Sequence, residues 1–501
     1  MNNILEWLEQ SADRYPEKTA FASVESELTY TQLVQRAKSI GTYLSSRIAP
    51  RTPVALYLVK ECTAISAMMG AVYAGCFYCV LDVRQPAQRL ENIVSTLQPG
   101  IVLTDRHFAE EAAERFANSG FEPVCIEDIW DEAIDEEKLA AIRAQALDID
   151  PLYVNFTSGS TGNPKGVVVG HRSVIDFIPS FVEIFGITAD DQIANQAPFD
   201  FDVSVKDIYS SLCAGATVHM IPREYFSVPT QLMDFLCERK ATVCTWAVSA
   251  MCFVSIMNGF EYRVPDTIKK VMFSGEVMPP KQLNKWRKYL PECRFANVYG
   301  PTEVTCNCTY YFIDREFDKR EVIPMGKAFP NEKVFLLDED DKLVTEPGVE
   351  GEICVSGTTL ALGYLNDPER TAAAFVQNPL HTSYLETIYR TGDLAKYDEN
   401  GDFVYISRKD FQIKHMGQRI ELGEIEMAAQ ADDGVTRACC IYNQKKKRIL
   451  LFYTGTTEKD TLVAELAERL PQYMVPNKTT HIDEMPLTKN GKIDRNALAA
   501  L

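Results

Sequence analysis

A glycine-rich segment, NFTSGSTGNPKGVVV, covers residues 155–169 and combines hydroxyl side chains with one lysine between two apolar runs. Gly159 and Gly162 allow backbone N–H groups to approach a ligand closely, and Lys165 adds a point charge suited to phosphate oxygens. The usual P-loop has the pattern GxxxxGK[ST] and opens a helix. Here the lysine follows a proline and a strand pattern comes next. On its own the segment fits either a phosphate-binding loop unlike the P-loop or an ordinary Ser/Thr/Gly surface loop.

Five further motifs follow this segment and decide between these interpretations. They are NVYGPTE (297–303), GEICVSG (351–357), YRTGDL (389–394), RKDFQIKHMGQRIELGEIE (408–426) and NGKIDR (490–495). In this order they resemble the adenylate-forming superfamily, and within it the amino-acid adenylation domains of nonribosomal peptide synthetases and their stand-alone relatives. NQAPFDFDVSVKDIYSSL (195–212) and FSGEVMPPK (273–281) are similar to segments of D-alanine–carrier protein ligases. The resemblance covers essentially the whole chain.

The resemblance implies an ATP-dependent reaction in two steps. A substrate carboxylate attacks the α-phosphate of ATP, Mg-pyrophosphate leaves, and the acyl-adenylate is then transferred to a thiol. Because an incoming carboxylate and a triphosphate repel each other, such a site must neutralise charge as it develops. The cofactors implied are ATP, Mg²⁺ and the phosphopantetheine arm of a partner carrier protein.

The matching positions give each residue an implied role. The glycine-rich loop and Lys165 would hold the β- and γ-phosphates, Glu303 would bind Mg²⁺, and Lys492 would bridge the substrate carboxylate and the α-phosphate. The implied catalytic residues are Lys165, Thr302, Glu303 and Lys492, and the implied ATP-binding residues are Thr157, Ser158, Gly159, Ser160, Thr161, Gly162, Lys165, Asn297, Tyr299, Gly300, Thr302, Asp393 and Arg408. Within this set, Tyr299 would stack on adenine, Asn297 would face its amino edge, and Asp393 would accept from the ribose hydroxyls. Asp410 matches the hinge about which the C-terminal domain rotates between the two steps.

Asp202 matches the aspartate that pairs with the α-ammonium of an amino-acid substrate. A buried carboxylate without a cation would be costly, so this residue favours an amino acid over a fatty or aryl acid. The implied substrate pocket comprises Asp202, Val203, Lys206, Thr245, Met272, Ser274, Val298, Cys306, Asn307 and Lys492.

Lys206 is the most informative member of the implied pocket, because a buried lysine requires an anion. One possibility is a substrate with a side-chain carboxylate, similar to glutamate or aspartate. Another is that Lys206 pairs with Asp202, which lies one helical turn away, or extends outward. The third is D-alanine or another small residue as substrate.

Two functions of other classes compete with amino-acid adenylation. An acyl-CoA synthetase would use CoA as thiol acceptor, and Asp202 argues against it. The second is a nucleotide-binding scaffold without activity. Against it, the chain keeps the residues that the resemblance marks as functional: Lys165, Glu303, Asp393 and Lys492. Because no carrier attachment motif or condensation motif is recognised, we expect a stand-alone monomeric enzyme that loads an acyl or peptidyl carrier protein in trans.

The fold must bring these motifs together, and the alternation of elements predicts an α/β protein with largely parallel sheets. Apolar β-branched runs at 53–59, 101–105, 166–170, 216–222 and 268–275 alternate with helical patterns such as 174–185 and 232–239. We expect an N-terminal adenylation core at 1–409, with α/β subdomains to about 325 and a small β-barrel-like subdomain after it. A mobile α+β C-terminal domain is expected at 410–501, with helices at 423–431 and 459–469 and strands at 438–443 and 448–454.

Composition excludes several other classes of function. The formal net charge of −19 disfavours nucleic-acid binding as the main activity. Neither a signal peptide nor an apolar run long enough to span a membrane is recognised. The fourteen cysteines are scattered in apolar contexts, so we expect reduced, mostly buried thiols and a cytoplasmic protein. Residues 445–448, KKKR, form the densest basic run, which fits a solvated turn or a docking site for an acidic partner.

Overall fold

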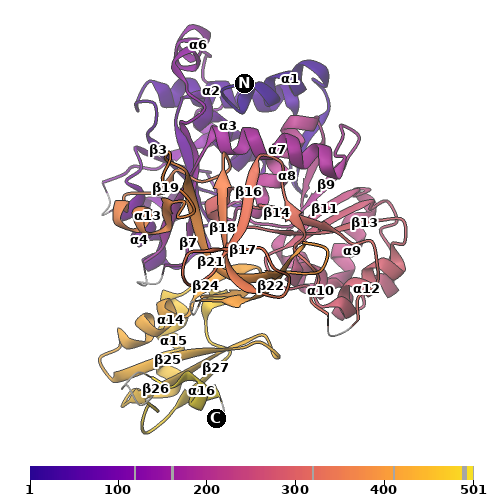
Figure 1. The fold of residues 1–501 in the computed structure, drawn as a ribbon. Helices are drawn as coiled ribbons and strands as arrows, with labels where there is room; N and C mark the ends of the chain where they lie inside the picture. Colours follow the sequence, from indigo (N-terminus) through magenta and orange to yellow (C-terminus); the bar gives the residue numbers. More distant parts are fainter. Residues whose placement is uncertain (118–119, 160–162, 319–320, 410–411, 488–492, 500) are drawn as a thin grey trace. The chain divides into compact units, whose positions relative to one another are not determined.

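The computed structural model describes residues 1–501 except 118–119, 160–162, 319–320, 410–411, 488–492 and 500 (Figure 1). The described chain divides into two compact units. The first comprises residues 1–83, 98–155 and 167–407, and the second comprises residues 84–97, 156–166 and 408–501. The expected hinge, Asp410, lies outside the described residues.

The larger sheet of the first unit has nine strands in the order β15-β14-β13-β12-β11-β9-β10-β1-β2. Its central strands β13, β12, β11, β9 and β10 run parallel, as does β1, whereas β14, β15 and β2 pair antiparallel. The strands are β1 (Thr19–Ala22), β2 (Glu27–Thr29), β9 (Gln192–Asn195), β10 (Thr217–Met220), β11 (Val243–Ala247), β12 (Lys270–Ser274), β13 (Arg294–Tyr299), β14 (Thr309–Phe312) and β15 (Lys327–Ala328). The predicted α/β class is thereby confirmed.

Helices connect the strands of this sheet, as parallel pairing requires. They are α7 (His171–Phe185), α8 (Val203–Ala214), α9 (Pro229–Glu238), α10 (Val248–Ile256), α11 (Gly259–Tyr262) and α12 (Pro280–Tyr289), with 3₁₀ turns η2 (Arg223–Ser227) and η3 (Thr302–Val304). Helix α8 ends at Gly215, whose φ of 74° is left-handed. A Cβ at Gly215 would lie 2.6 Å from the Tyr15 ring, so both the conformation and the space require glycine here.

A second sheet has seven strands in the order β19-β8-β7-β4-β3-β5-β6. Its strands are β3 (Pro53–Tyr57), β4 (Phe77–Leu81), β5 (Ile101–Thr104), β6 (Val124–Cys125), β7 (Pro151–Thr157), β8 (Lys165–Gly170) and β19 (Gly363–Tyr364). The accompanying helices are α1 (Leu5–Arg14), α2 (Tyr30–Ser45), α3 (Cys62–Tyr73), α4 (Ala87–Leu97), α5 (Ala109–Phe116), η1 (Ile126–Asp128) and α6 (Glu136–Gln145). The glycine-rich segment therefore joins the ends of two strands, as its sequence predicts.

The predicted β-rich region is an antiparallel sheet in the order β17-β16-β18-β21-β20, with β22 also paired to β21. It comprises β16 (Glu332–Leu337), β17 (Leu343–Val344), β18 (Glu350–Gly357), β20 (Phe375–Gln377), β21 (Thr387–Tyr397) and β22 (Phe403–Arg408), with the short helix α13 (Pro368–Ala374). The hairpin predicted around residues 399–401 is the connection between β21 and β22.

The C-terminal part of the second unit contains a hairpin, a three-stranded sheet and three helices. The hairpin is β23 (Gln412–His415) with β24 (Gln418–Glu421), and the sheet joins β25 (Val435–Asn443), β26 (Arg448–Gly455) and β27 (Lys478–His481). The helices are α14 (Leu422–Gln430), α15 (Lys459–Arg469) and α16 (Arg495–Ala499), with the turn η4 (Gln472–Met474). Helix α15 matches its predicted bounds, and β25 begins three residues before its predicted start.

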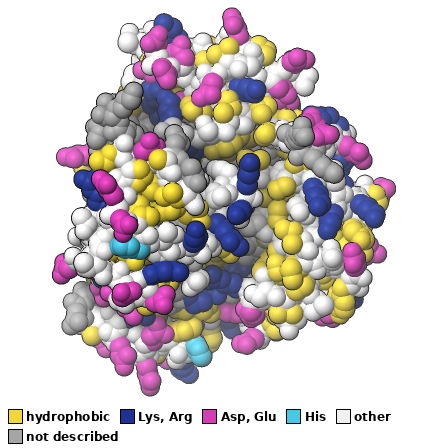
Figure 2. Space-filling model, turned by 90° about the horizontal axis from the view of Figure 1, so that it is seen from below, with side chains coloured by type: hydrophobic (Ala, Val, Ile, Leu, Met, Phe, Trp, Pro, Cys, Tyr) yellow, Lys and Arg dark blue, Asp and Glu magenta, His cyan; other side chains and the backbone are white. Residues whose placement is uncertain are grey.

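Each unit has its own hydrophobic core. In the first unit, Trp246 and Trp286 are fully buried, with their ring centroids 5.9 Å apart in an edge-to-face arrangement. The fourteen cysteines are all free, and no group of residues suited to holding a metal ion occurs among His, Cys, Asp and Glu in the described chain. None of the described helices has the length and apolar character needed to cross a membrane. Acidic and basic side chains both occur on the face drawn in Figure 2.

Candidate active site

The carboxyl ends of four parallel strands lie at one edge of the nine-stranded sheet. Strands β13, β12, β11 and β9 are parallel neighbours, so the residues that end them or follow them meet at this edge. Segments that are far apart in the sequence therefore lie together at this edge. The predicted site residues on these strands are Asn297, Val298 and Tyr299 on β13, Met272 and Ser274 on β12, and Thr245 on β11.

Tyr299 and Asp393 form a direct hydrogen bond in the first unit. The Tyr299 hydroxyl donates to Asp393 Oδ2 at 2.5 Å, and both side chains are buried. Burial, together with the nearby Asp393 carboxylate, raises the pKa of Tyr299 well above its ordinary value, so its hydroxyl keeps the proton that it donates. The backbone N–H of Asp393 also donates to the Thr391 hydroxyl at 3.0 Å. The structure thus joins the residues predicted to contact adenine and ribose.

The Asn297 side chain is fixed by the backbone of the segment that leads to β15. Its Nδ2 donates to the carbonyl oxygen of Pro324 at 2.8 Å. One amide proton is therefore used within the protein, and the side chain is 8% exposed. An amide held in this way keeps a defined orientation of its acceptor oxygen, as recognition of an amino group requires.

Glu303 is completely buried in the turn η3. Its Oε1 accepts a hydrogen bond from the Tyr364 hydroxyl at 2.8 Å, and its backbone oxygen accepts from the N–H of Ala361 at 2.8 Å. A buried carboxylate must be stabilised by donors or a cation. A carboxylate with one oxygen oriented by a neutral hydroxyl fits Mg²⁺, which prefers hard oxygen ligands. Thr302, in the same turn, is buried beside it.

Gly300 has a steric role that the sequence alone did not indicate. A Cβ at this position would lie 2.4 Å from the Cα of Asn307 and 2.8 Å from the carbonyl oxygen of Cys306. Glycine is therefore required for the close approach of these two backbone segments. Thr305 and Cys306 have φ values of 56° and 77°, in the left-handed region that is unfavourable for such residues. The chain is thus held in a strained conformation where it forms the predicted pocket wall.

Lys206 and Asn307 are hydrogen-bonded in the predicted substrate pocket. Lys206 Nζ donates to Asn307 Oδ1 at 2.7 Å, and each residue is 1% exposed. Burial lowers the pKa of Lys206, whereas Cys306, Asp202 and Asp207 raise it. The Cys306 thiol donates to the backbone oxygen of Asp202 at 3.0 Å. The remaining pocket residues of the first unit are also buried: Asp202, Val203, Thr245, Met272, Ser274 and Val298.

The glycine-rich loop belongs to the second unit, where the β23–β24 hairpin and the start of α14 contact it. The Ser158 hydroxyl donates to the backbone oxygen of Arg419 at 2.7 Å and accepts from the N–H of Glu421 at 3.1 Å. The backbone N–H of Gly159 also favours the ionised form of the Glu424 carboxylate, because it lowers the pKa of that group. In this structure, donors and acceptors of the loop are therefore used by residues of the C-terminal segment.

Glu424 also forms a buried ion pair with Arg89 of α4. The distance between Arg89 Nη1 and Glu424 Oε1 is 2.7 Å, and each side chain is 5% exposed. Burial raises the pKa of Glu424 to about 7, although Arg89 and the Gly159 N–H lower it. A cavity of about 250 Å³ lies beside this pair, lined in part by Asn163 and Pro164 of the loop.

Of the remaining predicted residues, the structure describes some and leaves others outside the described ranges. Lys165, at the start of β8, is 9% exposed, and Arg408 ends β22. Thr157 ends β7, and its Oγ1 has no hydrogen-bond partner among the described residues. Ser160, Thr161, Gly162, Asp410 and Lys492 lie outside the described residues.

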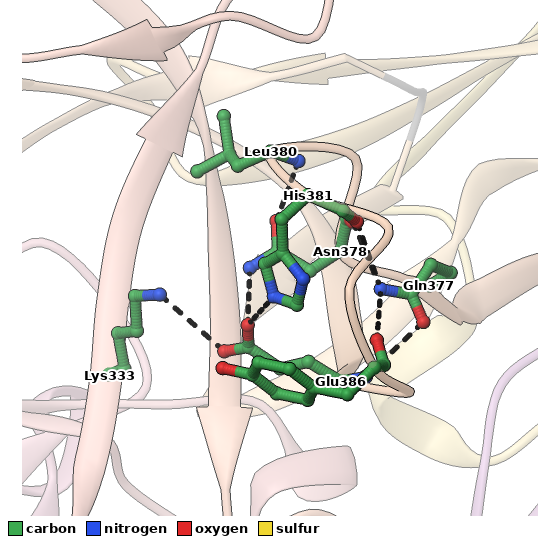
Figure 3. Close-up of polar contacts among 7 residues, drawn as sticks. Lys333, Gln377, Asn378, Leu380, His381 and Glu386 are labelled. Carbon is green, nitrogen blue, oxygen red and sulfur yellow. Dashed lines mark hydrogen bonds and ion pairs between the residues drawn. The ribbon is translucent and has the colours of Figure 1, made fainter.

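A second polar cluster lies on the loop between β20 and β21, in the antiparallel sheet of β16–β22. Glu386 contacts His381 Nε2 at 2.6 Å, accepts from Asn378 Nδ2 at 2.9 Å and lies 3.5 Å from Lys333 Nζ (Figure 3). The hydrogen bond with His381 is the main cause that lowers the pKa of Glu386 to about 2. Gln377 donates to three backbone oxygens of the same loop. These bonds fix the loop, so we interpret the cluster as structural.

Sequence reasoning missed Tyr364, Thr391 and Asp207, which support predicted site residues. Tyr364 lies 61 positions after its partner Glu303, and Asp207 is buried directly after Lys206. Thr391 and Asp207 lie in segments that the sequence analysis quoted, but the partners of all three residues depend on contacts that a motif does not contain. The signal that could have revealed Asp207 is a charged residue on the apolar face of a helix.

Comparison with known proteins shows two family matches. Residues 8–365 match the family described as AMP-binding enzyme, and residues 424–492 match its C-terminal domain. Gramicidin S synthase 2 of Brevibacillus brevis is 32% identical over 507 residues, covering 99% of this chain and 11% of the synthase. The chain thus spans about a tenth of the length of that relative.

Solved structures resemble the chain over nearly its whole length. The crystal structure of IdnL1 has a TM-score of 0.82 at 27% identity and covers 97% of this chain and 98% of its own. The structure of holo-PA1221, a nonribosomal peptide synthetase protein containing adenylation and peptidyl carrier protein domains, has a TM-score of 0.85 at 24% identity. It covers 100% of this chain and 84% of its own, and this likeness concerns the fold.

Proposed function

Because the chain belongs to the AMP-binding enzyme family, we propose that it activates an amino acid and loads it onto a carrier protein. The oxygen of the amino-acid carboxylate forms a bond to the α-phosphorus of ATP, and the bond to pyrophosphate breaks. The thiol of a phosphopantetheine arm then attacks the carbonyl carbon, forms a thioester and releases AMP. The observation that carries the proposal is the buried carboxylate of Asp202, which follows β9 in the chain, as Glu303 follows the parallel strand β13.

The residues of the first unit support the nucleotide half of this reaction. Tyr299 presents a ring at the end of β13, and Asp393, fixed through its backbone and by the Tyr299 hydroxyl, offers a carboxylate to ribose hydroxyls. Asn297 has an oriented amide for the adenine edge. Glu303 and Thr302 would hold magnesium, which when bound neutralises charge on the leaving pyrophosphate. Lys492, as the resemblance implies, would bridge the two reacting groups.

Asp202 supports an amino acid as substrate. It is 6% exposed at the residue before α8, and its carboxylate favours an α-ammonium group in this buried environment. Asp202→Asn should reduce exchange of pyrophosphate into ATP by at least 100-fold, because one charge-assisted contact is lost at the reacting end of the substrate. A wild-type level of exchange in this variant would overturn the amino-acid assignment.

Lys206 supports an acidic side chain on that amino acid. Its ammonium group is fully buried, and its hydrogen-bond partner, Asn307, is a neutral amide. A side-chain carboxylate would supply the anion that a buried ammonium group favours. This arrangement favours the interpretation in which Lys206 faces the substrate. The alternative substrate is D-alanine or another small amino acid.

A pyrophosphate-exchange panel over L- and D-amino acids tests the substrate. We expect glutamate or aspartate to give the highest kcat/KM, and no exchange above background with any acidic amino acid would exclude this substrate class. Preferred exchange with D-alanine would instead favour a D-alanine–carrier protein ligase. Consumption of CoA in the absence of a carrier would favour an acyl-CoA synthetase.

Carrier loading is tested with separately supplied carrier proteins in their phosphopantetheinylated form. Intact mass spectrometry should show addition of one aminoacyl group, and the apo carrier is the matched control. Lys492→Ala should lose exchange while the protein remains folded. Unchanged exchange in that variant would favour a non-catalytic nucleotide-binding protein.

A further inference from the structure

Asp207 is a buried carboxylate directly after Lys206 on α8. It is 1% exposed, and its Oδ2 accepts a hydrogen bond from Asn195 Nδ2 at 2.9 Å. Its Oδ1 has no donor at hydrogen-bond distance among the described residues. Thr245, a residue of the predicted pocket, also favours the ionised form of this carboxylate. Asp207 is therefore a buried residue of α8, next to Lys206 in the chain and hydrogen-bonded to the last residue of β9.

Two buried aspartates lie close to Lys206 in the chain: Asp207 directly follows it on α8, and Asp202 precedes that helix by one residue. Asp202 and Asp207 both favour the ammonium form of Lys206. The third group that acts on Lys206, the Cys306 thiol, stays neutral near pH 7 because burial raises its pKa well above the ordinary value. The proposed function requires that the ammonium group of the substrate binds Asp202. Asp207 is then the aspartate whose negative charge still stabilises the ammonium form of Lys206.

We propose that Asp207 is a specificity-determining residue that sets how strongly the pocket prefers an anionic over a neutral substrate side chain. The inference rests on the proposed function. A substrate carboxylate is attracted by Lys206 but repelled by Asp207, and in a buried environment both effects are strong. When the substrate has a neutral side chain, the positive charge of Lys206 is still stabilised by the negative charge of Asp207. Removal of the Asp207 charge therefore favours the anionic side chain and disfavours the neutral one.

The surroundings of Asp207 make its charge adjustable. Burial raises the pKa of Asp207 to about 7, while Asn195, Lys206, Thr245 and Lys60 lower it, in decreasing order. Lys60 donates to the backbone oxygen of Asn195 at 3.2 Å. Lys206 is thus the cation that acts most strongly on Asp207.

The test compares wild type with Asp207→Asn, which keeps the shape and removes the charge. The probes are glutamate against glutamine and aspartate against asparagine, two pairs that differ in charge at nearly constant size. We expect the ratio of kcat/KM for acidic over neutral substrate, measured by pyrophosphate exchange, to rise at least fivefold. An equal loss for both members of a pair indicates a purely structural role and overturns the inference, as does a fall in the ratio.

A double-variant comparison shows whether Asp207 acts through Lys206. In the Lys206→Met background, adding Asp207→Asn should leave the acidic-to-neutral ratio unchanged within twofold. A shift as large as that in wild type contradicts the inference. If Asp207→Asn fails to fold, judged by its thermal transition, Asn195→Ala replaces it. This change removes the donor that favours the ionised form, so it should raise the ratio in the same direction.

The same data separate the inference from the proposed function. Absence of exchange by the wild-type protein with every amino acid contradicts the proposed function itself. Exchange by the wild-type protein with an unchanged acidic-to-neutral ratio in Asp207→Asn contradicts only the role of Asp207.

Discussion

Tyr299 and Asp393 are 94 positions apart in the sequence, yet the Tyr299 hydroxyl donates to Asp393 Oδ2 at 2.5 Å. Tyr299 ends a strand of the nine-stranded sheet, and Asp393 lies on β21 of the antiparallel sheet. The hydrogen bond therefore fixes two sheets to each other at the proposed nucleotide site. It also orients the carboxylate that would accept from ribose.

Tyr299→Phe keeps the aromatic ring and removes the hydroxyl that donates to Asp393. A hydrogen bond to a charged group contributes about 1.5–3 kcal/mol, so we expect the KM for ATP to rise about tenfold with a smaller change in kcat. Pyrophosphate exchange at varied ATP measures both constants. Tyr311→Phe is the matched control, because Tyr311 donates to the exposed Asp314 at 3.2 Å outside the proposed site. An unchanged KM for ATP in Tyr299→Phe would show that the pair has no role in nucleotide binding.

Tyr364 orients the buried carboxylate of Glu303, and its removal should affect metal binding. In Tyr364→Phe the carboxylate loses the donor at 2.8 Å, so the Mg²⁺ concentration that gives half-maximal exchange should rise several-fold. Mn²⁺ binding in the presence of ATP, followed by electron paramagnetic resonance, gives a readout that is independent of turnover. Glu303→Gln is the positive control, with loss of the bound Mn²⁺ signal. Equal metal titrations for Tyr364→Phe and wild type would refute the positioning role.

The sequence predicted the α/β class and the positions of several main strands because buried parallel strands leave a clear apolar pattern. Runs at 53–59, 101–105 and 268–275 each contain a strand, although the strands end earlier than the apolar runs do. Element ends depend on capping and tertiary contacts, which periodicity does not contain. Helix 459–469 was predicted at its observed bounds, whereas β25 starts earlier than expected.

For the site residues too, the sequence identified some features and left others to the structure. Motif order identified Glu303 and Asp393, but the partners that hold them, Tyr364 and Tyr299, depend on contacts between distant segments. The sequence left Lys206 with several possible partners, and the structure shows it bonded to Asn307, 101 positions away. Such pairings follow from strand order and from the close approach at Gly300, neither of which a local motif specifies.

Two buried histidines should make the protein sensitive to mild acid. Burial lowers the pKa of His171 and of His219 to about 4, below the ordinary value of 6.5. The unfolded chain therefore takes up protons first, so stability is fully present above pH 6.5 and falls as the pH drops toward 4. At pH 5.5 we expect each histidine to reduce the free energy of unfolding by about 1–2 kcal/mol.

Urea unfolding at pH 7.5 and pH 5.5 measures this difference. His219→Asn should reduce the loss between the two pH values, because the group that titrates is gone. His481→Asn is the control, since His481 is exposed. A loss of stability that stays the same in His219→Asn would show that other groups cause the acid sensitivity.

The basic turn at residues 445–448 connects β25 and β26, and all four of its side chains are exposed. Asn443 closes the turn, because its Oδ1 accepts from the backbone N–H of Lys446 at 3.0 Å. The turn presents concentrated positive charge on a chain with a net charge of −19. Carrier proteins are generally acidic, so the turn is a candidate docking site for the proposed partner.

Charge reversal of Lys445 and Lys446 to Glu tests this docking role. We expect the KM for the carrier to rise several-fold while pyrophosphate exchange is unaffected, because exchange does not involve the carrier. The effect should shrink at high salt, as for other contacts between exposed charges. Lys478→Glu, at an exposed position on β27, is the matched control for a general change in charge. Equal loss of exchange and loading, or an equal effect of Lys478→Glu, would leave the turn as a solvated connection between two strands.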